Sequence, residues 1–491
     1  MRSPALAAMV AMSLLSACTT SKSDGQLSLA AGDIQDDIRL GQQQHPKIMQ
    51  HYGGAYDDPA LGAYVDRIGQ RLKAVSEYAD IPFTFTLLDS DVVNAFALPG
   101  GYVYVSRGLL ALAQDEAELA GVIGHEIGHV TSRHGAERQV ATTIGGLLGA
   151  IGTIGGAVLG GQAGAQLGQQ LGQIAVGGGL AQYSQSQEFQ SDKLGVRYLA
   201  RAGYDTDAMG DFLQALQTNA ELQAKLRGQS ANAGGFDHFF SSHPFTPDRV
   251  VRARERSQER GSENNERDRA RFLDEIDGLV FGESPAQGYV LGQEFAHSPL
   301  RFRFAVPDGF DLQNTPDAVF AKGKDRTIIF DIGKREANVA LTRYSAKGWV
   351  DFKTLDRVER LRLASGLEAA VGYGKVKVNE NGSADGGFVV IEGDGDQVYR
   401  FALLAKQFGN DDRRALISTA ESFRRLSARE AAKLKPLRIE LVEVRAGDTI
   451  DRLAARMEVA KLPREYFITI NGLDRGRELR VGDRVKLIVR K

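Results

Sequence analysis

The stretch "AGVIGHEIGHVTSRHG", residues 120–135, contains three of the eight histidines of the chain, with a glutamate directly after the first of them. On a helix, His125 and His129 lie one turn apart on one face, so both imidazoles can bind the same ion. Glu126 is rotated by about 100° from His125 and can reach a water molecule on that ion from the side. The spacing predicts a helical metal site. The alternative is a buried helix that contains histidines by chance.

The sequence also indicates where this helix begins and ends. Asp115 and Glu118 form a capping pair at its N-terminus, apolar residues recur after them at helical spacing, and Gly135 is placed for a C-terminal cap. His134 follows His125 by nine residues and would face away from the metal on this helix. We therefore expect His134 to be structural.

A metal at this site needs a third protein ligand. Cys18 is the single cysteine of the chain, so the ligand is expected to be His, Asp or Glu. The segment "SQEFQSDKLG" places Glu188 and Asp192 on the same face of a second expected helix, residues 187–202. Glu188 would complete a His2Glu set of the kind that holds catalytic zinc, and Asp192 would accept a hydrogen bond from a liganding imidazole. The alternative is a solvated acidic face on an ordinary helix.

The N-terminal stretch "MRSPALAAMVAMSLLSAC" has a basic residue, Arg2, followed by an apolar run too short to span a bilayer. It resembles a bacterial lipoprotein signal peptide, which implies a leader at residues 1–17, a lipid on Cys18 and a tether at residues 18–41. The residue after Cys18 is not Asp, which by the same resemblance favours the outer membrane. The alternative is an ordinary secretory signal with a chance cysteine.

Length and composition set the broad class of protein. A chain of 491 residues is long enough for about three domains. Hydrophobic residues make up 43%, charged residues 25%, and the formal net charge is −2. These values are typical of a globular protein and exclude a chain that is disordered throughout. No nucleic-acid partner is expected.

Four separated motifs occur in a fixed order within residues 42–260: "NAFALPGGYVYVSRGLL", "HEIGHVTSRH", "EFQSD" and "SSHPFTPDR". Together they resemble the zinc metallopeptidases of family M48, the group containing HtpX and the CAAX prenyl proteases, and especially its periplasmic branch. The resemblance implies an α+β multidomain protein whose peptidase domain is mainly helical and of the zincin (gluzincin) type. It implies one zinc ion held by His125, His129 and Glu188, with Glu126 as the general base.

The resemblance also gives Asp192, His243 and Arg249 a place beside the metal. It implies that His243 either stabilises the oxyanion or binds zinc as a fourth ligand that keeps the enzyme latent. The alternative is a capping histidine, because "SHPFTPD" is also rich in turn-forming residues.

Upstream of the metal motif, "PFTFTLLD" and "GYVYVS" alternate like two strands joined through "NAFALPGG", whose Pro-Gly-Gly indicates a turn. The family resemblance implies that Asn94, Ala95, Phe96 and Ala97 bind the substrate backbone by strand addition. The alternative is a plain core hairpin.

Residues 139–187 contain no charged side chain, and glycines recur there with several Gly-x-x-x-Gly spacings. The segment is expected to be a lid or a close-packed helix pair over the cleft. The alternative is a helical hairpin that enters the membrane by small-residue packing. The second half is rich in glutamine and too polar for lipid, which favours the lid.

The remainder of the chain is expected to form two further domains. Residues 261–277 are charge-dense and are expected to be a solvated linker. Residues 278–427 are expected to form an α+β domain with an antiparallel sheet, strands such as "RTIIFDI" and "GFVVIEG", and helices at residues 347–364 and 411–426. Their sequence contains no recognisable group of catalytic residues and does not indicate their role.

The C-terminal residues 436–491 are expected to fold as strand, helix, helix and strand. Their Gly-Asp-Thr, Ile-Asn-Gly-Leu and Val-Gly-Asp elements resemble a LysM module, which implies binding to peptidoglycan. The inserted "AKLPREYF" departs from that family. The alternative is a LysM-like fold that makes protein contacts only.

These observations predict a zinc endopeptidase of the bacterial cell envelope, anchored by lipid at Cys18, with misfolded or assembling envelope proteins as substrates by resemblance. The alternative is a proteolytically latent scaffold or chaperone that binds peptidoglycan. A metal-dependent peptidoglycan amidase is a third candidate, which the glutamate ligand followed by an aspartate disfavours.

Overall fold

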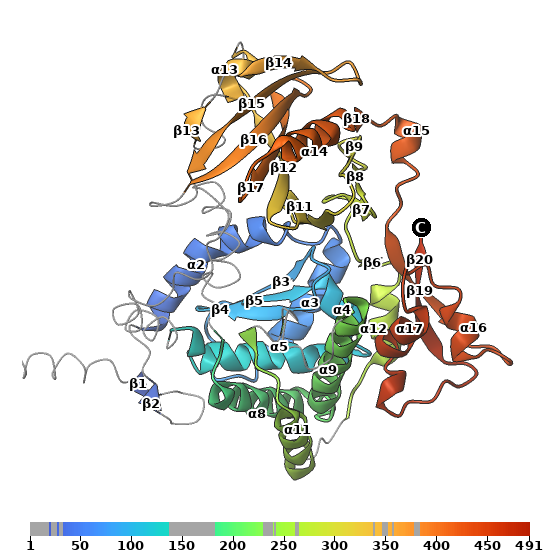
Figure 1. Cartoon of the computed structure of the whole chain (residues 1–491). Helices are drawn as coiled ribbons and strands as arrows, with labels where there is room; N and C mark the ends of the chain where they lie inside the picture. The colour runs from blue at the N-terminus through green and yellow to red at the C-terminus, as the bar shows by residue number, and fades with distance from the viewer. Residues whose placement is uncertain are drawn as a thin grey trace, which may run out of the picture. The chain divides into compact units, whose positions relative to one another are not determined.

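The computed structural model describes residues 19–20, 27–28, 33–136, 182–228, 239, 242–260, 265–336, 339–345, 352–355, 358–377 and 383–491. The chain divides into two compact units (Figure 1). The first unit contains the described residues up to 136 together with residues 182–282 and 436–491, and the second contains residues 283–435. The predicted leader and Cys18 lie outside the described residues, as do residues 139–181 of the glycine-rich segment.

A three-stranded sheet lies at the centre of the first unit. Its order is β3 (Thr84–Leu88), β5 (Tyr102–Ser106) and β4 (Ala95–Leu98), with β3 parallel and β4 antiparallel to β5. The turn predicted at Pro-Gly-Gly joins β4 to β5. The expected hairpin of β3 and β5 is therefore wrong, because these strands are parallel and the chain between them supplies an edge strand.

Helices cover both faces of this sheet (Figure 1). On one face α2 (Ile34–His51) packs against Phe96, Leu98 and Tyr104. On the other face Ala95 and Ala97 of β4 join the main core with α3 (Pro59–Lys73) and α5 (Glu116–Thr131). Successive residues of β4 thus face opposite helices, as the period of a strand requires.

The predicted metal-binding helix is α5, and all of its residues are buried. Asp115 caps it by accepting a hydrogen bond from the backbone N–H of Glu118, as expected. The helix ends at Thr131, four residues before the predicted cap at Gly135. The chain leaves the helix through Ser132 and then Arg133, whose φ of 58° is left-handed.

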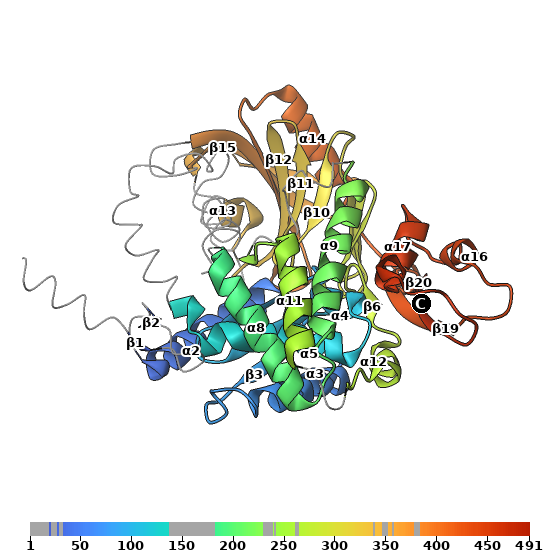
Figure 2. The ribbon, with the colours of Figure 1, turned by 90° about the horizontal axis from the view of Figure 1, so that it is seen from below.

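Further helices lie against α5 and complete the first unit. Figure 2 shows three of them side by side, namely α8 (Gln185–Ala202), α9 (Ala208–Leu226) and α11 (Pro247–Arg260). Of these, α8 and α9 contact α5 directly. The first unit also contains α4 (Arg107–Leu112) and α12 (Arg269–Ile276). Phe272, Leu273 and Ile276 of α12 are buried in the main core, so the prediction of a solvated linker at residues 261–277 does not hold for this part.

Residues 436–491 have the expected order of strand, helix, helix and strand. They form β19 (Leu437–Glu443), α16 (Ile450–Ala454), α17 (Pro463–Ile470), a 3-10 turn η1 (Leu473–Arg475) and β20 (Arg484–Arg490). They have a small core of their own, but they belong to the first unit rather than standing apart. β19 pairs with β20 and also with β6 (Val280–Phe281), which precedes the second unit.

The second unit contains an eight-stranded antiparallel sheet, as the sequence predicted in outline. Along its main path lie β10 (Asp311–Asn314), β11 (Val319–Gly323), β12 (Arg326–Lys334), β17 (Gln397–Ala405), β16 (Ser383–Glu392), β15 (Glu368–Lys377) and β13 (Phe352–Leu355), with β14 (Glu359–Arg362) also on β15. Because β13 and β14 are strands, the helix expected at residues 347–364 is wrong.

A smaller sheet and short helices complete the second unit. The sheet contains β7 (Tyr289–Leu291), β8 (Glu294–His297), β9 (Phe302–Ala305) and β18 (Arg424–Arg425). The helices are α13 (Leu341–Ser345), α14 (Asn410–Glu421) and α15 (Ala428–Ala431). The helix α14 confirms most of the helix expected at residues 411–426 and packs on β16 and β17 (Figure 1).

Within the described parts of the chain, no helix has both the length and the apolar character needed to cross a membrane. The choice between a lid and a membrane hairpin for residues 139–187 falls almost wholly outside those parts and stays a prediction.

Candidate metal centre

Four side chains from three parts of the first unit meet at one point. His125 and His129 come from α5, Glu188 comes from the first turn of α8, and His243 lies in the turn before α11. One ligand atom of each lies within 4.8 Å of the others, and all four side chains are buried. Three imidazoles and one carboxylate are ligands that zinc accepts.

The nitrogens that face one another in this cluster indicate a cation between them. Nε2 of His125 lies 3.0 Å from Nε2 of His129, and Nδ1 of each ring faces another partner. With their protons on Nδ1, the two Nε2 lone pairs point at each other, which is unfavourable unless a positive ion binds both. Oε1 of Glu188 lies 3.4 Å from Nε2 of His129 and supplies a negative charge at the same point. The residues therefore fit a zinc ion.

Glycines bring the two ligand helices together. A Cβ on Gly124 would lie 3.3 Å from Cα of Gly195, and a Cβ on Gly128 would lie 3.1 Å from Cα of Ser191. Only residues without a side chain allow α5 and α8 to pack this closely. Glu188 of α8 is thereby brought to the two histidines of α5.

Asp192 and Arg249 support the ligands from behind. Oδ1 of Asp192 lies 2.9 Å from Nδ1 of His125, which is the position predicted for it. Arg249 is fully buried, and its Nε and Nη2 donate to the carboxylate of Asp192 at 2.8 and 2.7 Å. Its Nη1 also lies 2.6 Å from Oε2 of Glu188. This second pairing of Arg249 was not expected from the sequence.

The charges around the two carboxylates keep them ionised. Burial alone would raise the pKa of Asp192, but Arg249 outweighs it and lowers that pKa. Burial would also raise the pKa of Glu188, but His243 and Arg249 hold it well below its usual value. Both groups are therefore available as acceptors or ligands at neutral pH.

His243 and Glu126 complete the cluster. Nδ1 of His243 lies 3.0 Å from Oε1 of Glu188, and its Nε2 lies 3.6 Å from Oε1 of Glu126. His243 thus lies within the cluster, and its role as oxyanion donor or fourth ligand stays a prediction. Glu126 is fully buried beside it. Its role as general base remains a prediction.

His134 does not face away from the cluster as the sequence predicted. Its Nδ1 lies 2.9 Å from Nδ1 of His129. The prediction was wrong because it extended the helix to Gly135, whereas the chain turns at Arg133 and returns to the metal helix. Tyr183 was also missed. Its ring stacks on His129 with 3.7 Å between the centroids, and no local pattern in the sequence indicates this contact.

The predicted substrate residues Asn94, Ala95, Phe96 and Ala97 lie at and in the edge strand β4. All four are buried among the described residues. A cavity of about 10 Å³ lies between Ala97 and His129, with room for one water molecule. Strand addition by substrate remains a prediction.

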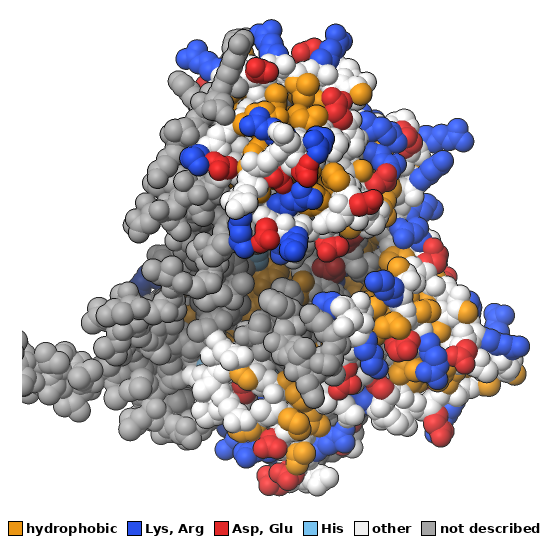
Figure 3. Space-filling view, viewed as in Figure 1, with side chains coloured by type: hydrophobic (Ala, Val, Ile, Leu, Met, Phe, Trp, Pro, Cys, Tyr) orange, Lys and Arg blue, Asp and Glu red, His pale blue; other side chains and the backbone are white. Residues whose placement is uncertain are grey.

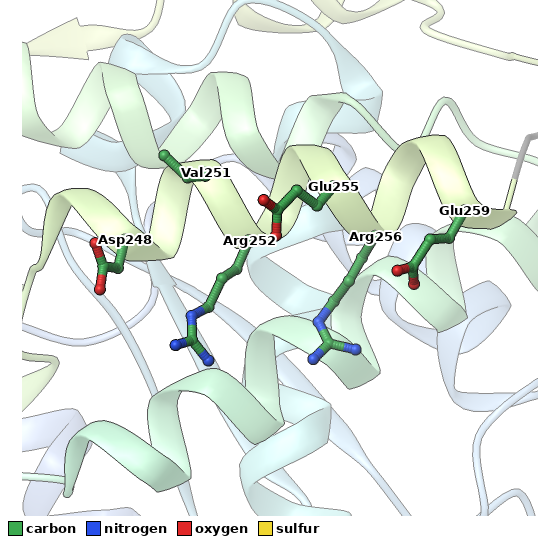
Figure 4. A pocket seen from close by; sticks show the side chains of 6 residues that line it. All are labelled: Asp248, Val251, Arg252, Glu255, Arg256 and Glu259. Atoms are coloured by element: carbon green, nitrogen blue, oxygen red, sulfur yellow. The ribbon is translucent and has the colours of Figure 1, made fainter.

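A larger cavity of about 350 Å³ lies elsewhere, along α11. Figure 4 shows the side chains that line it, namely Asp248, Val251, Arg252, Glu255, Arg256 and Glu259. All of them come from one helix, and none is a ligand of the cluster. We therefore place the functional site at the four-ligand cluster.

The buried cluster has residues of the kind that zinc metallopeptidases use to bind their metal. Residues 59–257 match the family described as Peptidase family M48, and this range includes the four residues of the cluster, Glu126, Asp192 and Arg249. This part of the chain is similar to M48 peptidase domains.

Named relatives agree with this assignment. The beta-barrel assembly-enhancing protease of Yersinia pestis is 34% identical over 223 residues, which cover 41% of this chain and 40% of the relative. The mitochondrial metalloendopeptidase OMA1 of Schizosaccharomyces pombe is 29% identical over 221 residues, 44% of this chain and 60% of the relative. The metalloprotease YcaL of Escherichia coli is 29% identical over 195 residues, 39% of this chain and 70% of the relative. The chain spans less than half the length of the first of these relatives.

Proposed function

We propose that this protein is a zinc endopeptidase of the bacterial cell envelope that hydrolyses peptide bonds in misfolded or assembling envelope proteins. The observation that carries the proposal is the buried cluster of His125, His129, Glu188 and His243 with Glu126 beside it. The name of the Yersinia pestis relative supports the compartment and the substrate class.

The residues divide the chemistry between them. Zinc bound by the cluster would supply a Lewis acid that polarises the substrate carbonyl and acidifies water. Glu126 takes the proton of the attacking water and passes it to the leaving amine, the usual task of a carboxylate at this position. Nε2 of His243, 3.6 Å from Glu126, is placed to donate a hydrogen bond to the oxyanion. Residues 94–97 at the sheet edge would hold an extended substrate.

We further propose a location at the outer membrane. The leader at residues 1–17 would be removed and Cys18 lipidated, so that the mature chain is anchored by lipid and tethered through residues 18–41. Figure 3 shows basic and acidic side chains interspersed on the face in view, which gives no support for a polyanionic partner.

A second function is favoured by the same cluster. His243 lies among the ligands, and Glu126 has no exposed surface in the described structure. A chain held in this state is a latent protease and would act as an envelope scaffold or chaperone. The LysM-like segment at residues 436–491 would then supply contact with peptidoglycan.

One experiment separates these functions. Zinc content and casein cleavage are measured for three forms that start after Cys18: the unaltered chain, Glu126→Gln and His243→Ala. One zinc per chain, with cleavage lost in Glu126→Gln, supports the endopeptidase. Cleavage that begins only in His243→Ala supports the latent protein. Absence of zinc from every form would overturn both.

A further inference from the structure

A chain of three side chains links α8 to the ligand His129. Oε1 of Gln190 lies 2.9 Å from Nε2 of His134, and Nδ1 of His134 lies 2.9 Å from Nδ1 of His129. Both distances are those of hydrogen bonds. His134 and His129 are buried, and Gln190 is half-buried one turn or less from both Glu188 and Asp192. The contact therefore lies directly behind the metal cluster.

The ligand role of His129 determines the position of every proton in this chain. Nε2 of His129 faces the cluster and must keep its lone pair to bind a metal. Its proton is then on Nδ1 and is donated to Nδ1 of His134. His134 must accept there, so its own proton is on Nε2 and is donated to Oε1 of Gln190. His129 and His134 are therefore each left with one tautomer.

We propose that His134 is a positioning residue that fixes the tautomer and ring orientation of His129 for zinc, and that Gln190 fixes His134 in turn. The inference rests on the proposed zinc site. Without an acceptor at Nδ1, His129 can place its proton on Nε2, 3.0 Å from Nε2 of His125, where it cannot bind a metal. The stacked ring of Tyr183 restrains the plane of His129 but does not select between its tautomers.

The two ligand histidines of α5 are supported by different groups. His125 faces the carboxylate of Asp192, which is paired with Arg249, whereas His129 faces a neutral imidazole. Nδ1 of each ring lies 2.9 Å from its partner, so both rings turn Nε2 toward the cluster. The neutral partner does so without adding a third buried negative charge beside Glu188 and Asp192.

The local backbone holds His134 in this position. Arg133 has a left-handed φ of 58° and reverses the chain directly after α5. Its guanidinium donates to the carboxylate of Asp37 in α2 at 2.7 and 3.0 Å and to the carbonyl of Asp33 at 3.2 Å. The strained residue is thus secured by an ion pair to another helix.

The test compares zinc affinity in four variants of the full chain, measured by competition with a chelator. His134→Phe keeps a ring but removes the acceptor, and we expect it to lose about 10–100-fold in affinity, the usual effect of losing such a partner. His134→Asn places Oδ1 near the position of Nδ1 and should recover much of the affinity. Gln190→Met should lose less than His134→Phe, and Gln190→Glu, which keeps an acceptor, should stay near the unaltered protein.

The visible spectrum of the cobalt-substituted protein gives a second readout. We expect it to change in His134→Phe and to return toward the original in His134→Asn. His45→Phe is the matched control, since His45 contacts the hydroxyl of Tyr104 at 2.7 Å outside the cluster and should change neither readout.

Two results would overturn the proposal: zinc affinity unchanged in both His134→Phe and Gln190→Met, or an equal loss in His134→Phe and His134→Asn. The metal-free melting temperatures show whether such an equal loss comes from folding alone. If the unaltered chain binds no zinc, it is the proposed function that fails. If His134→Phe does not fold, the variants of the half-buried Gln190 still test the proposal.

Discussion

Arg249 is the residue on which the charge balance of the site depends. It is fully buried and pairs with both Asp192 and Glu188. Removal of one partner from a buried ion pair leaves an uncompensated charge. Zinc would add positive charge at the same point, so Arg249 and the metal share the neutralisation of the two carboxylates.

Arg249→Met should therefore destabilise the metal-free protein more than the zinc-loaded one. We expect a loss of about 3–5 kcal/mol in the free energy of unfolding without metal, the usual range for a broken buried pair, and a smaller loss with zinc. Urea unfolding with a chelator and with excess zinc measures both. An equal loss under the two conditions would contradict the shared role.

Among single residues, the sequence predicted those that lie one helical turn from each other. His125 and His129 are four residues apart on one helix, as are Glu188 and Asp192, and the structure places all four at the cluster. The contacts of Arg249 and His134 could not be predicted in this way. The first joins residues 57 positions apart, and the second depends on the end of a helix at Thr131.

The crossing of α5 and α8 is the element on which the ligand geometry depends. Ser191 and Leu194 of α8 approach the Gly128 position of α5 so closely that a Cβ there would lie 3.1 Å from a backbone atom and 3.2 Å from a side-chain Cβ. Neither neighbour is the flexible end of a side chain. A methyl group must therefore push the two helices apart.

Gly128→Ala should lower both stability and zinc affinity. Overpacking of this kind costs about 1–3 kcal/mol in the free energy of unfolding, and separation of the helices moves Glu188 from the histidines. The matched control is Gly62→Ala on α3, where the added Cβ would meet open space. That change should raise stability by about 0.5–1 kcal/mol, because alanine is the better helix former. If Gly128→Ala and Gly62→Ala changed the free energy of unfolding equally, the tight crossing of α5 and α8 would be contradicted.

Pairing between strands explains the helix that was wrongly predicted. Residues 347–364 contain apolar residues at spacings that a helix also shows, yet Glu359–Arg362 form β14 on β15. The partner, β15, lies after them in the chain, and its backbone decides the outcome. The helix α14 was predicted well because it starts directly after Gly409 with a local cap supplied by Asp412.

At the scale of the whole first unit, its C-terminal segment is attached to the metal domain by polar contacts. Nζ of the buried Lys486 donates to the carbonyls of Ala111 and Ala113 at 2.8 and 2.7 Å. Arg475 donates to Glu118, in the first turn of α5, at 2.8 Å. The segment therefore supports the start of the metal helix. The sequence predicted its internal order but not this attachment, which joins residues more than 350 positions apart.

Lys486 gives this attachment a dependence on pH. Burial, followed by the charge of Arg269, lowers the pKa of Lys486 well below its usual value. The unfolded chain then binds the proton more tightly than the folded one, so the contribution of Lys486 to stability increases as pH rises toward about 10. At a pH above the pKa that Lys486 has in the folded protein, its neutral amine still has two N–H groups for the two carbonyls.

Lys486→Met should therefore cost more stability at alkaline pH than at neutral pH. We expect a loss of about 1–3 kcal/mol at high pH, because two buried carbonyls lose their donor. Urea unfolding of both proteins between pH 6 and pH 10 gives the difference at each pH. A difference that shrinks as pH rises would contradict the buried amine.

The first unit is built from stretches of the chain that lie before and after the second unit, and this affects when its metal site can form. Residues 436–491 follow the second unit in the sequence, yet they complete the domain that contains the metal ligands. A chain synthesised from its N-terminus cannot make the contact between Ala111 and Lys486 until the 375th residue after Ala111 has emerged. Contacts of such long separation form late and slowly. The order of synthesis therefore delays assembly of the first unit, and with it the metal site, until both stretches of the chain are present.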